Sequence, residues 1–550
     1  MSQNKKYDAI IFTDFTDYTI PIKSAGANVI ASHLRRHGYS IKIIDNFVYL
    51  LEKNKEELFK YMKDHIGPNT LFVGFSTTFM AIFDLERKYN INTSTYVKNQ
   101  NYFRARMSLN TKDSCVPNFK EFMELLVEKY SHVKIVLGGQ GTGTHIFYNA
   151  WKDVIDCWIK GLGEDSILKF IENMKNGIES PSVMEDVFAH NSDFYNQEPS
   201  FSSEDNVFPN EILPMIVSKG CRFNCKFCSY PLLGRKPSDE YVRSEESLYK
   251  EFKQNYDNFG TTQYNMMCDT FNETTDKLLR VQRAIDRVGI KINFWAYIRM
   301  DLVHAHPEQL EILKEMGIRS AFFGIESLYD PSAKAIGKGF GREKTIEMLQ
   351  KMKDSWGDEV LLHGAFIIGL PHETPETANE WCQMLCDKEI PLDSISMNAL
   401  RIFPNNPTTL AKTSRMFFSE FDLNAEKYGY VRGASNEKLT KYPNIENRAL
   451  PWQRSDKMVD RKGGWYNEHW SMASAQLFAI MWKRRIAKNS ADKLSQTHRT
   501  GNTSMSLLNS DYTWKEIMTP RKDKEKEFLD HIKMKKKEML IEYAGNVFTQ

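Results

Sequence analysis

The stretch SKGCRFNCKFCSYP (residues 218–231) holds Cys221, Cys225 and Cys228 in the spacing C-x3-C-x2-C, directly after an apolar run that is typical of a strand. Three thiolates on one tight loop can ligate three irons of a cubane cluster and leave the fourth iron open to a small molecule. A zinc site would need a fourth ligand, and no nearby Cys or His stands at the expected spacing. Three unrelated cysteines are the remaining alternative, but free cysteines seldom lie so close together. The spacing therefore predicts a [4Fe-4S] cluster.

Short apolar runs alternate with helical patterns on both sides of this loop. The runs before the loop that we expect to be strands are 7–15, 40–46, 71–77, 133–139 and, shorter than the others, 153–161. The run that leads into the loop is 213–218, and those after it are 264–269, 294–299, 320–325, 361–369 and 394–403. Strands that alternate with helices form parallel sheets. We therefore expect an α/β protein with an N-terminal doubly wound, Rossmann-like domain and then a partial (β/α)6 barrel of the TIM type.

Domain boundaries are expected where the composition changes. We expect the Rossmann-like domain at 1–180, a polar linker at 181–212, the barrel at 213–410, and at 411–550 a mostly helical C-terminal extension that shapes the substrate pocket. Within the first domain, the stretch 84–118 is polar and aromatic without a clear period, which predicts an inserted loop or lid. In the extension, 471–487 and 521–541 have helical patterns.

The composition is that of a globular protein and argues against a protein that coats nucleic acid or spans a membrane. The 550 residues carry a formal net charge of +2, with 41% hydrophobic and 26% charged residues, as in ordinary globular proteins. This small charge argues against a protein that coats nucleic acid, and the run 520–538 has the mixed charge of a solvated helix face. We recognise no signal peptide and no apolar stretch long enough for a bilayer, so we expect no membrane partner. The eight cysteines do not form a disulfide framework, which favours a reducing compartment, the cytoplasm.

The cysteine loop resembles the signature of the radical S-adenosylmethionine (SAM) superfamily, with Phe227 at the aromatic position before the last cysteine. Later runs resemble, in order and spacing, the members that carry an N-terminal cobalamin-binding domain: YNMMCDTFNET (264–274), FWAYIRMD (294–301), FFGIES (322–327) and FIIGLPHET (366–374). The resemblance implies that the open iron chelates SAM. In that family, electron transfer from the cluster then cleaves SAM to a 5′-deoxyadenosyl radical, which abstracts a hydrogen atom.

The resemblance also implies roles at the carboxyl ends of the barrel strands. Backbone carbonyls at Asp269 and Thr270 would accept from the ammonium group of SAM, and Arg299 would pair with its carboxylate. The acceptors for the ribose hydroxyls would be Glu326 and Ser327, and the residues that let the chain approach the adenine would be Gly369 and Pro371. Each residue also has a purely structural alternative: Arg299 can bridge to Asp301 or Glu326, and the glycines can serve only as turn residues.

Cys268 departs from the family pattern, which has an aspartate there. As a tentative catalytic residue, its thiol would donate hydrogen to a radical or become alkylated during turnover. The alternative is a small apolar residue packed under the cluster, and buried free cysteines are common. Cys382 and Cys386 lie four residues apart, on one face of a helix, and are expected in the core because two thiolates do not make a second cluster.

A glycine-rich stretch near the end of the first domain resembles the second half of the cobalamin-binding domain. Its glycines would let the backbone approach the nucleotide tail of cobalamin, and Glu164 stands in the family's final Gly-Glu-Gly-Glu motif; the glycines are Gly138, Gly139, Gly141 and Gly143. A tight turn is an equally good interpretation of such a loop. The loop 14–26 contains no histidine, so the Asp-x-His-x-x-Gly motif that ligates cobalt from below in cobalamin mutases is absent.

Taken together, these features predict a cobalamin-dependent radical SAM enzyme that methylates an unactivated carbon of an unknown substrate, with SAM, a [4Fe-4S] cluster and cobalamin as cofactors. An electron donor such as flavodoxin or ferredoxin would be its partner. The alternatives are radical cyclisation, oxidation or rearrangement without methyl transfer, and a corrinoid-binding sensor that is not an enzyme. Methylthiolation of tRNA is disfavoured, because neither an N-terminal cysteine trio nor a C-terminal RNA-binding barrel is recognisable.

Overall fold

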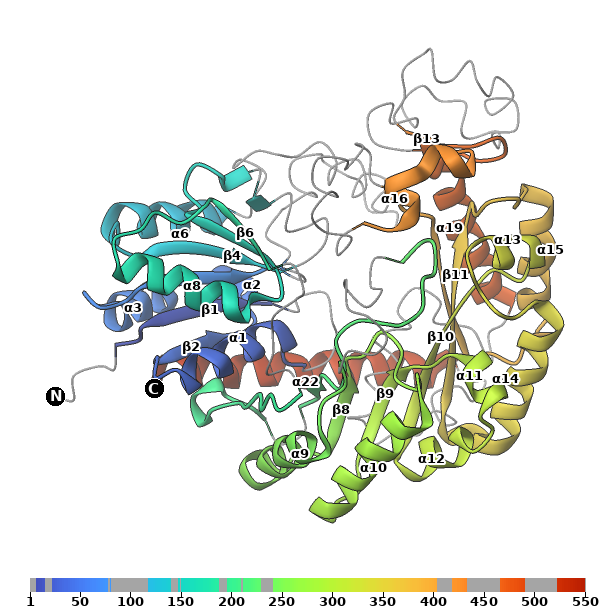
Figure 1. The fold of residues 1–550 in the computed structure, drawn as a ribbon, viewed down its shortest axis with the longest axis horizontal. Helices are drawn as coiled ribbons and strands as arrows, with labels where there is room; N and C mark the ends of the chain where they lie inside the picture. The colour runs from blue at the N-terminus through green and yellow to red at the C-terminus, as the bar shows by residue number, and fades with distance from the viewer. Residues whose placement is uncertain are drawn as a thin grey trace. The chain divides into compact units, whose positions relative to one another are not determined.

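The computed structural model describes residues 6–14, 22–77, 80, 117–139, 147–148, 150–186, 195–208, 211–228, 241–402, 418–432, 465–489 and 522–549 (Figure 1). The chain divides into two compact units. The first unit contains Met1–Pro214, Glu246–Thr262 and Ile532–Gln550, and the second contains Met215–Glu245 and Gln263–His531. The expected lid at 84–118 lies almost entirely outside the described residues.

A six-stranded sheet organises the first unit. Its strands are β1 (Ala9–Thr13), β2 (Ile41–Ile44), β3 (Phe72–Ser76), β4 (Lys134–Gly138), β5 (Cys157–Gly161) and β6 (Val183–Asp186). They lie in the order β2-β1-β3-β4-β5-β6, and every pair is parallel. The order reverses between β1 and β3, as in doubly wound sheets, in which ligands bind beyond the carboxyl ends of the strands.

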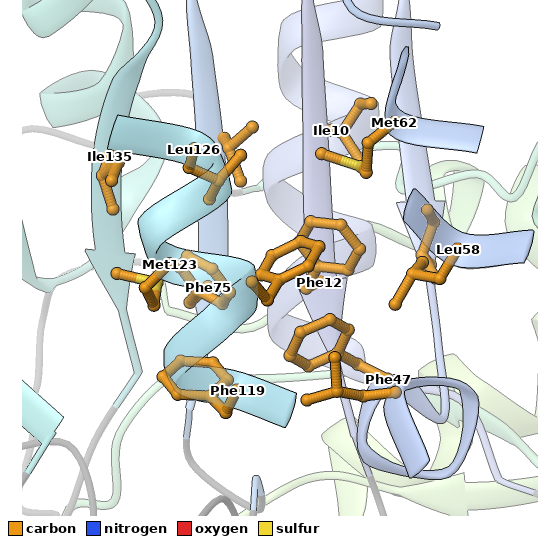
Figure 2. Packing of buried hydrophobic residues seen from close by; sticks show 14 of the residues in the cluster. Ile10, Phe12, Phe47, Leu58, Met62, Phe75, Phe119, Met123, Leu126 and Ile135 are labelled. Carbon is orange, nitrogen blue, oxygen red and sulfur yellow. The ribbon is translucent and has the colours of Figure 1, made fainter. Parts of the chain in front are cut away.

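Apolar side chains cover both faces of this sheet, because its buried strands carry few polar residues. On one face the ring of Phe12 of β1 packs 4.5 Å from the ring of Phe47 (Figure 2). It also lies edgewise at 5.3 Å from the ring of Phe122. The helices on this face are α2 (Phe47–Lys53), α3 (Lys55–His65) and α6 (Pro117–Lys129), and those on the other are α1 (Ala25–Arg36) and α8 (Gly163–Lys175). Gly163 allows close packing of α8, since a Cβ there would lie 2.9 Å from Ile30.

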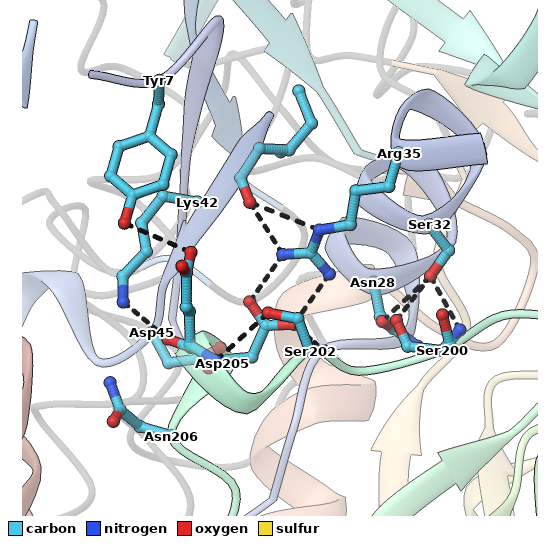
Figure 3. A network of polar contacts seen from close by, with 12 residues as sticks. Tyr7, Asn28, Ser32, Arg35, Lys42, Asp45, Ser200, Ser202, Asp205 and Asn206 are labelled. Carbon is cyan, nitrogen blue, oxygen red and sulfur yellow. Dashed lines mark hydrogen bonds and ion pairs between the residues drawn. The ribbon is translucent and has the colours of Figure 1, made fainter. Parts of the chain in front are cut away.

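Part of the expected linker at 181–212 belongs to the first sheet. Residues 183–186 form β6, which pairs with β5, and a 3-10 helix follows at Ser203–Asp205. Figure 3 shows the hydrogen bonds that join this segment to α1. Arg35 donates to both carboxylate oxygens of Asp205 at 2.8 Å, and the Ser32 hydroxyl donates to the Ser200 carbonyl at 2.8 Å. The polar residues that suggested a linker are therefore partners of α1.

A buried ion cluster lies where the chain leaves β1 and β2. Lys23 is 1% exposed and lies 2.9 Å from Asp45 and 3.5 Å from Glu211. The hydroxyl of Tyr543, from α22 (Lys522–Thr549), accepts from the backbone N–H of Asp45 at 2.7 Å, and the Tyr543 ring lies 5.3 Å from the Lys23 ammonium. Tyr543, Ala544 and Val547 also join the hydrophobic core of the first unit. The end of the chain thus completes the domain that the start of the chain forms.

The strands of the second sheet lie side by side in the same order as they occur in the sequence. Its order is β7-β8-β9-β10-β11-β12, for β7 (Leu213–Met215), β8 (Gln263–Met266), β9 (Asn293–Tyr297), β10 (Ile318–Glu326), β11 (Leu361–Ile368) and β12 (Ser394–Ala399). Pairing is parallel from β8 to β12. The helices between them are α9 (Glu245–Phe259), α10 (Thr275–Val288), α11 (Met300–Ala305), α12 (Gln309–Glu315), α13 (Asp330–Ala335), α14 (Arg342–Trp356) and α15 (Pro375–Cys386). This is the arrangement of a partial barrel.

The C-terminal part of the chain contributes to both units. In the second unit, a two-stranded sheet pairs β13 (Val431–Arg432) with β14 (Trp465–Tyr466), and α19 (Met472–Asn489) packs on β11, β12 and α15. The helix expected at 521–541 is α22, whose last part packs in the first unit. The compact units therefore divide the expected extension at 411–550.

Candidate active site

The three cysteines lie on one loop after β7. Gly220, directly before Cys221, has a φ of 86°, which favours glycine, and the Cys228 N–H donates to the Cys225 carbonyl at 3.0 Å. Cys221 and Cys225 are buried, Cys228 is half-buried, and all three thiols are free of disulfides. This donor set fits a cubane cluster. In the part of the chain that the structure describes, no three Cys, His, Asp or Glu side chains gather as ligands of a single metal ion, and a cubane does not require this because each thiolate binds its own iron.

A buried polar network holds the start of this loop. The Glu273 carboxylate accepts from the backbone N–H of Arg222 at 2.7 Å and from the Tyr241 hydroxyl at 2.8 Å. Lys277 lies 3.9 Å from Glu273 and donates to the Thr270 carbonyl at 2.8 Å. Buried charges keep their position when each has charged and hydrogen-bonded partners, so this network fixes the loop backbone next to Cys221.

Arg299 lies beside the second cysteine. Its Nη1 is 3.6 Å from the Cys225 Sγ, and its guanidinium stacks 3.8 Å from the centre of the Phe223 ring. Nε and Nη2 bond the two carboxylate oxygens of Asp301, so the structural alternative considered for Arg299 is present as well. Among the residues that the structure describes, no ion pair joins Arg299 to Glu326, whose partner is Lys338. A cation in this position can attract a ligand carboxylate at the cluster while Asp301 fixes its orientation.

Glu326 ends β10 in an unusual backbone conformation. Its φ is 71°, the register of β10 against β11 shifts between Gly324 and Glu326, and its side chain is buried. Strained backbone of this kind is concentrated at functional sites. Burial raises the pKa of the carboxyl, whereas Lys338, 3.6 Å away, lowers it. Lys338 also lies 5.6 Å from the centre of the Phe227 ring, which connects this carboxylate to the cysteine loop.

The turn after β11 is fixed by Glu373. Its carboxylate accepts from the Gly369 N–H at 2.7 Å, from the Trp381 indole at 3.3 Å and from the Ser327 hydroxyl at 3.4 Å. Burial raises the pKa of Glu373 to about 7. Gly369 has a φ of 87°, and a Cβ there would lie 2.5 Å from the Trp465 ring. The Pro371 carbonyl accepts from the Ser332 hydroxyl at 2.7 Å.

The other predicted residues of the second unit lie on or near β8. Thr270 is buried, with its hydroxyl 3.3 Å from the Cys221 Sγ, and the neighbouring Asp269 is exposed. Cys268 is 2% exposed, and its catalytic role stays a prediction. Cys382 and Cys386 are buried on α15, as expected for core residues.

Two of the residues predicted to bind cobalamin, Gly138 and Gly139, lie at the carboxyl end of β4 in the first unit. Gly138 ends β4, its carbonyl accepts from the Thr77 N–H at 3.0 Å, and Gly139 has a φ of 112°. Glu164 is 2% exposed and accepts from the Gln197 amide at 3.0 Å, which is a structural contact. Gly141 and Gly143 lie outside the described residues.

The sequence analysis missed several residues near the site as members of it, among them Phe223, Glu273, Lys277, Lys338 and Glu373. Phe223 and Glu273 stand inside the quoted motifs, so their positions were a usable signal. Lys338 lies 12 residues beyond Glu326 and outside every motif, so only the fold reveals that it pairs with that carboxylate.

Comparison with known proteins identifies the second unit. The radical SAM superfamily profile matches residues 215–385. An uncharacterized methyltransferase of Pyrococcus horikoshii is 26% identical over 240 residues, covering 40% of this chain and 50% of that protein. The hopanoid C-2 methylase of Rhodopseudomonas palustris is 26% identical over 195 residues, covering 34% and 36%. The chain thus spans about half or less of the length of these two relatives.

Solved structures share the fold of both units. The radical SAM methyltransferase TsrM from Kitasatospora setae, solved with tryptophan and a SAM analogue, aligns with a TM-score of 0.51 at 14% identity, covering 78% of this chain and 77% of that one. The cobalamin-dependent radical enzyme OxsB, solved with aqua-cobalamin and SAM, aligns with a TM-score of 0.51 at 13% identity, covering 98% and 78%. The predicted fold class is confirmed. Within the described residues, no helix is long and apolar enough to cross a membrane. The match of residues 215–385 to the radical SAM superfamily implies SAM and a [4Fe-4S] cluster as cofactors, and the chain shares the fold of TsrM and OxsB.

Proposed function

We propose that this protein is a cobalamin-dependent radical SAM enzyme that methylates an unactivated carbon of its substrate. The observation that carries the proposal is the cysteine loop with Arg299 3.6 Å from Cys225, at the carboxyl ends of the strands. It occurs in a chain whose first unit shares the fold of cobalamin-dependent enzymes. Relatives named as methyltransferases support methyl transfer over other radical reactions.

The residues of the second unit would bind and orient SAM. When bound, the cluster supplies the electron that cleaves SAM, and the protein contributes positioning and exclusion of water. Arg299 would hold the SAM carboxylate, with Asp301 fixing the guanidinium plane. Glu326 would accept from the ribose hydroxyls, and its strained backbone aims the carboxylate. Glu373 would keep the turn at Gly369 close to the adenine.

The first unit would bind cobalamin at the carboxyl ends of β1, β3 and β4. Support comes from the sheet reversal between β1 and β3 and from Gly139, whose φ of 112° lets the backbone turn sharply after β4. Cobalamin would supply the methyl carrier. No histidine in 14–26 offers a nitrogen to the cobalt, so the cofactor would bind without a ligand from that loop.

Reduction of the cluster requires an electron donor, and we propose flavodoxin or ferredoxin. The seven described cysteines are all free thiols. Free thiols and an iron–sulfur cluster favour a reducing compartment, so we place the protein in the cytoplasm.

Anaerobic turnover with and without cobalamin tests the proposal. The reconstituted protein is incubated with SAM and a chemical reductant, and 5′-deoxyadenosine and S-adenosylhomocysteine are quantified. A methylase should form 5′-deoxyadenosine with either preparation and S-adenosylhomocysteine only with cobalamin present. Formation of 5′-deoxyadenosine alone in both would favour cyclisation, oxidation or rearrangement. Formation of neither product would favour a corrinoid-binding sensor.

A further inference from the structure

One face of the second sheet changes from buried to accessible along its strands. Alternate side chains of a strand point to the same face. The register places Trp295 of β9 beside Ser320 of β10, and Tyr297 beside Phe322. Trp295 and Ser320 are buried, whereas two residues further toward the carboxyl ends Phe322 is half-buried and Tyr297 is 38% exposed.

The same change continues across β11 and β12. His363 and Ser394 are buried, and the side chains that follow them on this face are accessible. We call the accessible positions the open face: Tyr297, Phe322, Gly324, Ala365, Ile367, Ser396 and Asn398. The open face lies toward the strand ends at which Arg299 contacts Cys225.

The β9–β10 side of the open face is aromatic. Tyr297 packs edgewise against Trp295 at 4.8 Å and against Phe322 at 4.7 Å. Phe322 in turn lies 4.5 Å from the ring of His363. Both nitrogens of His363 lie within hydrogen-bond distance of serine hydroxyls, and burial lowers its pKa to about 3, so the ring is neutral. These rings hold Tyr297 in place while more than a third of its side chain stays exposed.

The β12 side of the open face is polar but uncharged, since it presents Ser396 and Asn398. None of the seven residues of the open face carries a charge. The charged residues at the strand ends, Arg299 and Glu326, already have partners in Asp301 and Lys338. A charged ligand group buried on the open face would therefore lack a counter-ion, which is costly.

We propose that the substrate binds the open face through a flat, uncharged ring system, with Tyr297 and Phe322 against the ring and Ser396 and Asn398 at its polar edge. Two strand spacings, about 10 Å, separate β10 from β12, which suits two fused rings with a hydrogen-bonding edge. Aromatic pairs gain affinity beyond the area that they bury. The inference rests on the proposed function, which requires a substrate near SAM.

Binding of model compounds tests this inference without turnover. The first probe is 2-quinolinone, which is flat and neutral. Its ring-saturated lactam is neutral but not flat, and quinoline-2-carboxylate is flat but charged. Calorimetry measures the affinity of each probe for the reconstituted protein in the presence of SAM. We expect 2-quinolinone to bind about tenfold more tightly than either other probe. Tyr297→Leu should remove that advantage and Tyr297→Phe should keep it. Tyr256→Leu is the matched control, because Tyr256 is similarly exposed, at 42%, on α9.

The outcomes separate this inference from the proposed function. Equal affinity for the flat and saturated probes, no binding of 2-quinolinone, or tighter binding of the carboxylate would overturn the inference. Unchanged affinity in Tyr297→Leu, with the thermal midpoint also unchanged, would overturn it as well. Because the assay contains no methyl transfer, selective binding by a protein that forms no S-adenosylhomocysteine would refute the methylase alone.

Discussion

Nη1 of Arg299 lies 3.6 Å from the Sγ of Cys225, while the same guanidinium bonds both carboxylate oxygens of Asp301. Asp301 is a quarter exposed, so removal of its partner leaves a carboxylate that water can solvate. Arg299→Gln should therefore lower the free energy of unfolding by less than about 1 kcal/mol and weaken SAM binding at least about tenfold. Thermal midpoint without SAM and calorimetric SAM affinity measure the two effects. Arg319→Gln, which breaks an exposed pair with Glu359, is the control and should leave affinity unchanged.

Glu326→Gln extends this test to the ribose side of the site. Burial already favours the neutral carboxyl, so the neutral amide should change the apo midpoint little. SAM affinity should fall, because the amide offers the ribose hydroxyls a weaker acceptor. A large drop of the midpoint with unaltered affinity, in either variant, would show that these residues hold the barrel together and do not bind SAM.

The cluster assignment predicts that Cys221, Cys225 and Cys228 are its only protein ligands. A triple Cys→Ala variant, reconstituted anaerobically, should lose the broad visible absorbance of the iron–sulfur chromophore. Cys382→Ala and Cys386→Ala together form the control and should retain it, because both thiols are buried on α15. Four irons per chain in the triple variant would refute the assignment.

Cobalamin in the first unit should carry no protein nitrogen on its lower face. The loop 14–26 contains no histidine, so electron paramagnetic resonance of the cob(II)alamin form should lack nitrogen superhyperfine splitting. Clear splitting would contradict this geometry. Failure of the protein to take up cobalamin would instead favour the radical reactions without methyl transfer.

Glu373 should make stability depend on pH between about 4.5 and 7. Its folded pKa of about 7 lies above the ordinary 4.5, so the folded state binds more protons than the unfolded state in this window. Stability therefore falls as pH rises through it, by about 3 kcal/mol in total. Denaturant unfolding at pH 5 and pH 8 should show this loss in the native protein and a smaller loss in Glu373→Gln. Equal losses would mean that Glu373 is ionised throughout.

Gly369 should tolerate no side chain. Its φ of 87° strains any other residue, and a Cβ would also lie 2.5 Å from the Trp465 ring. Gly289 separates the two effects, because it is left-handed, with a φ of 77°, but a Cβ there meets nothing within 4 Å. Gly289→Ala should cost roughly 1 kcal/mol from backbone strain alone, and Gly369→Ala clearly more. Similar thermal midpoints for the two variants would show that the tryptophan moves aside easily.

The fold and the cluster loop could be predicted because their signals are local. Apolar runs such as 71–77 and the spacing of Cys221, Cys225 and Cys228 lie within a few residues of each other. The polar segment around Ser200 and Asp205 was expected to be a linker, since composition does not reveal that α1 supplies its partners. The sequence analysis also missed Lys338, because its pairing with Glu326 exists only once β10 and α13 are folded.

The contact between Tyr543 and Asp45 has a consequence for biosynthesis, because 498 residues of sequence separate the two partners. At about 5–20 residues per second, a ribosome needs roughly 25–100 s to reach the tyrosine after it has made the aspartate. During that time the nascent first sheet lacks the helix whose Tyr543, Ala544 and Val547 fill its core. The core of the first unit can therefore be completed only after the whole second unit has been translated.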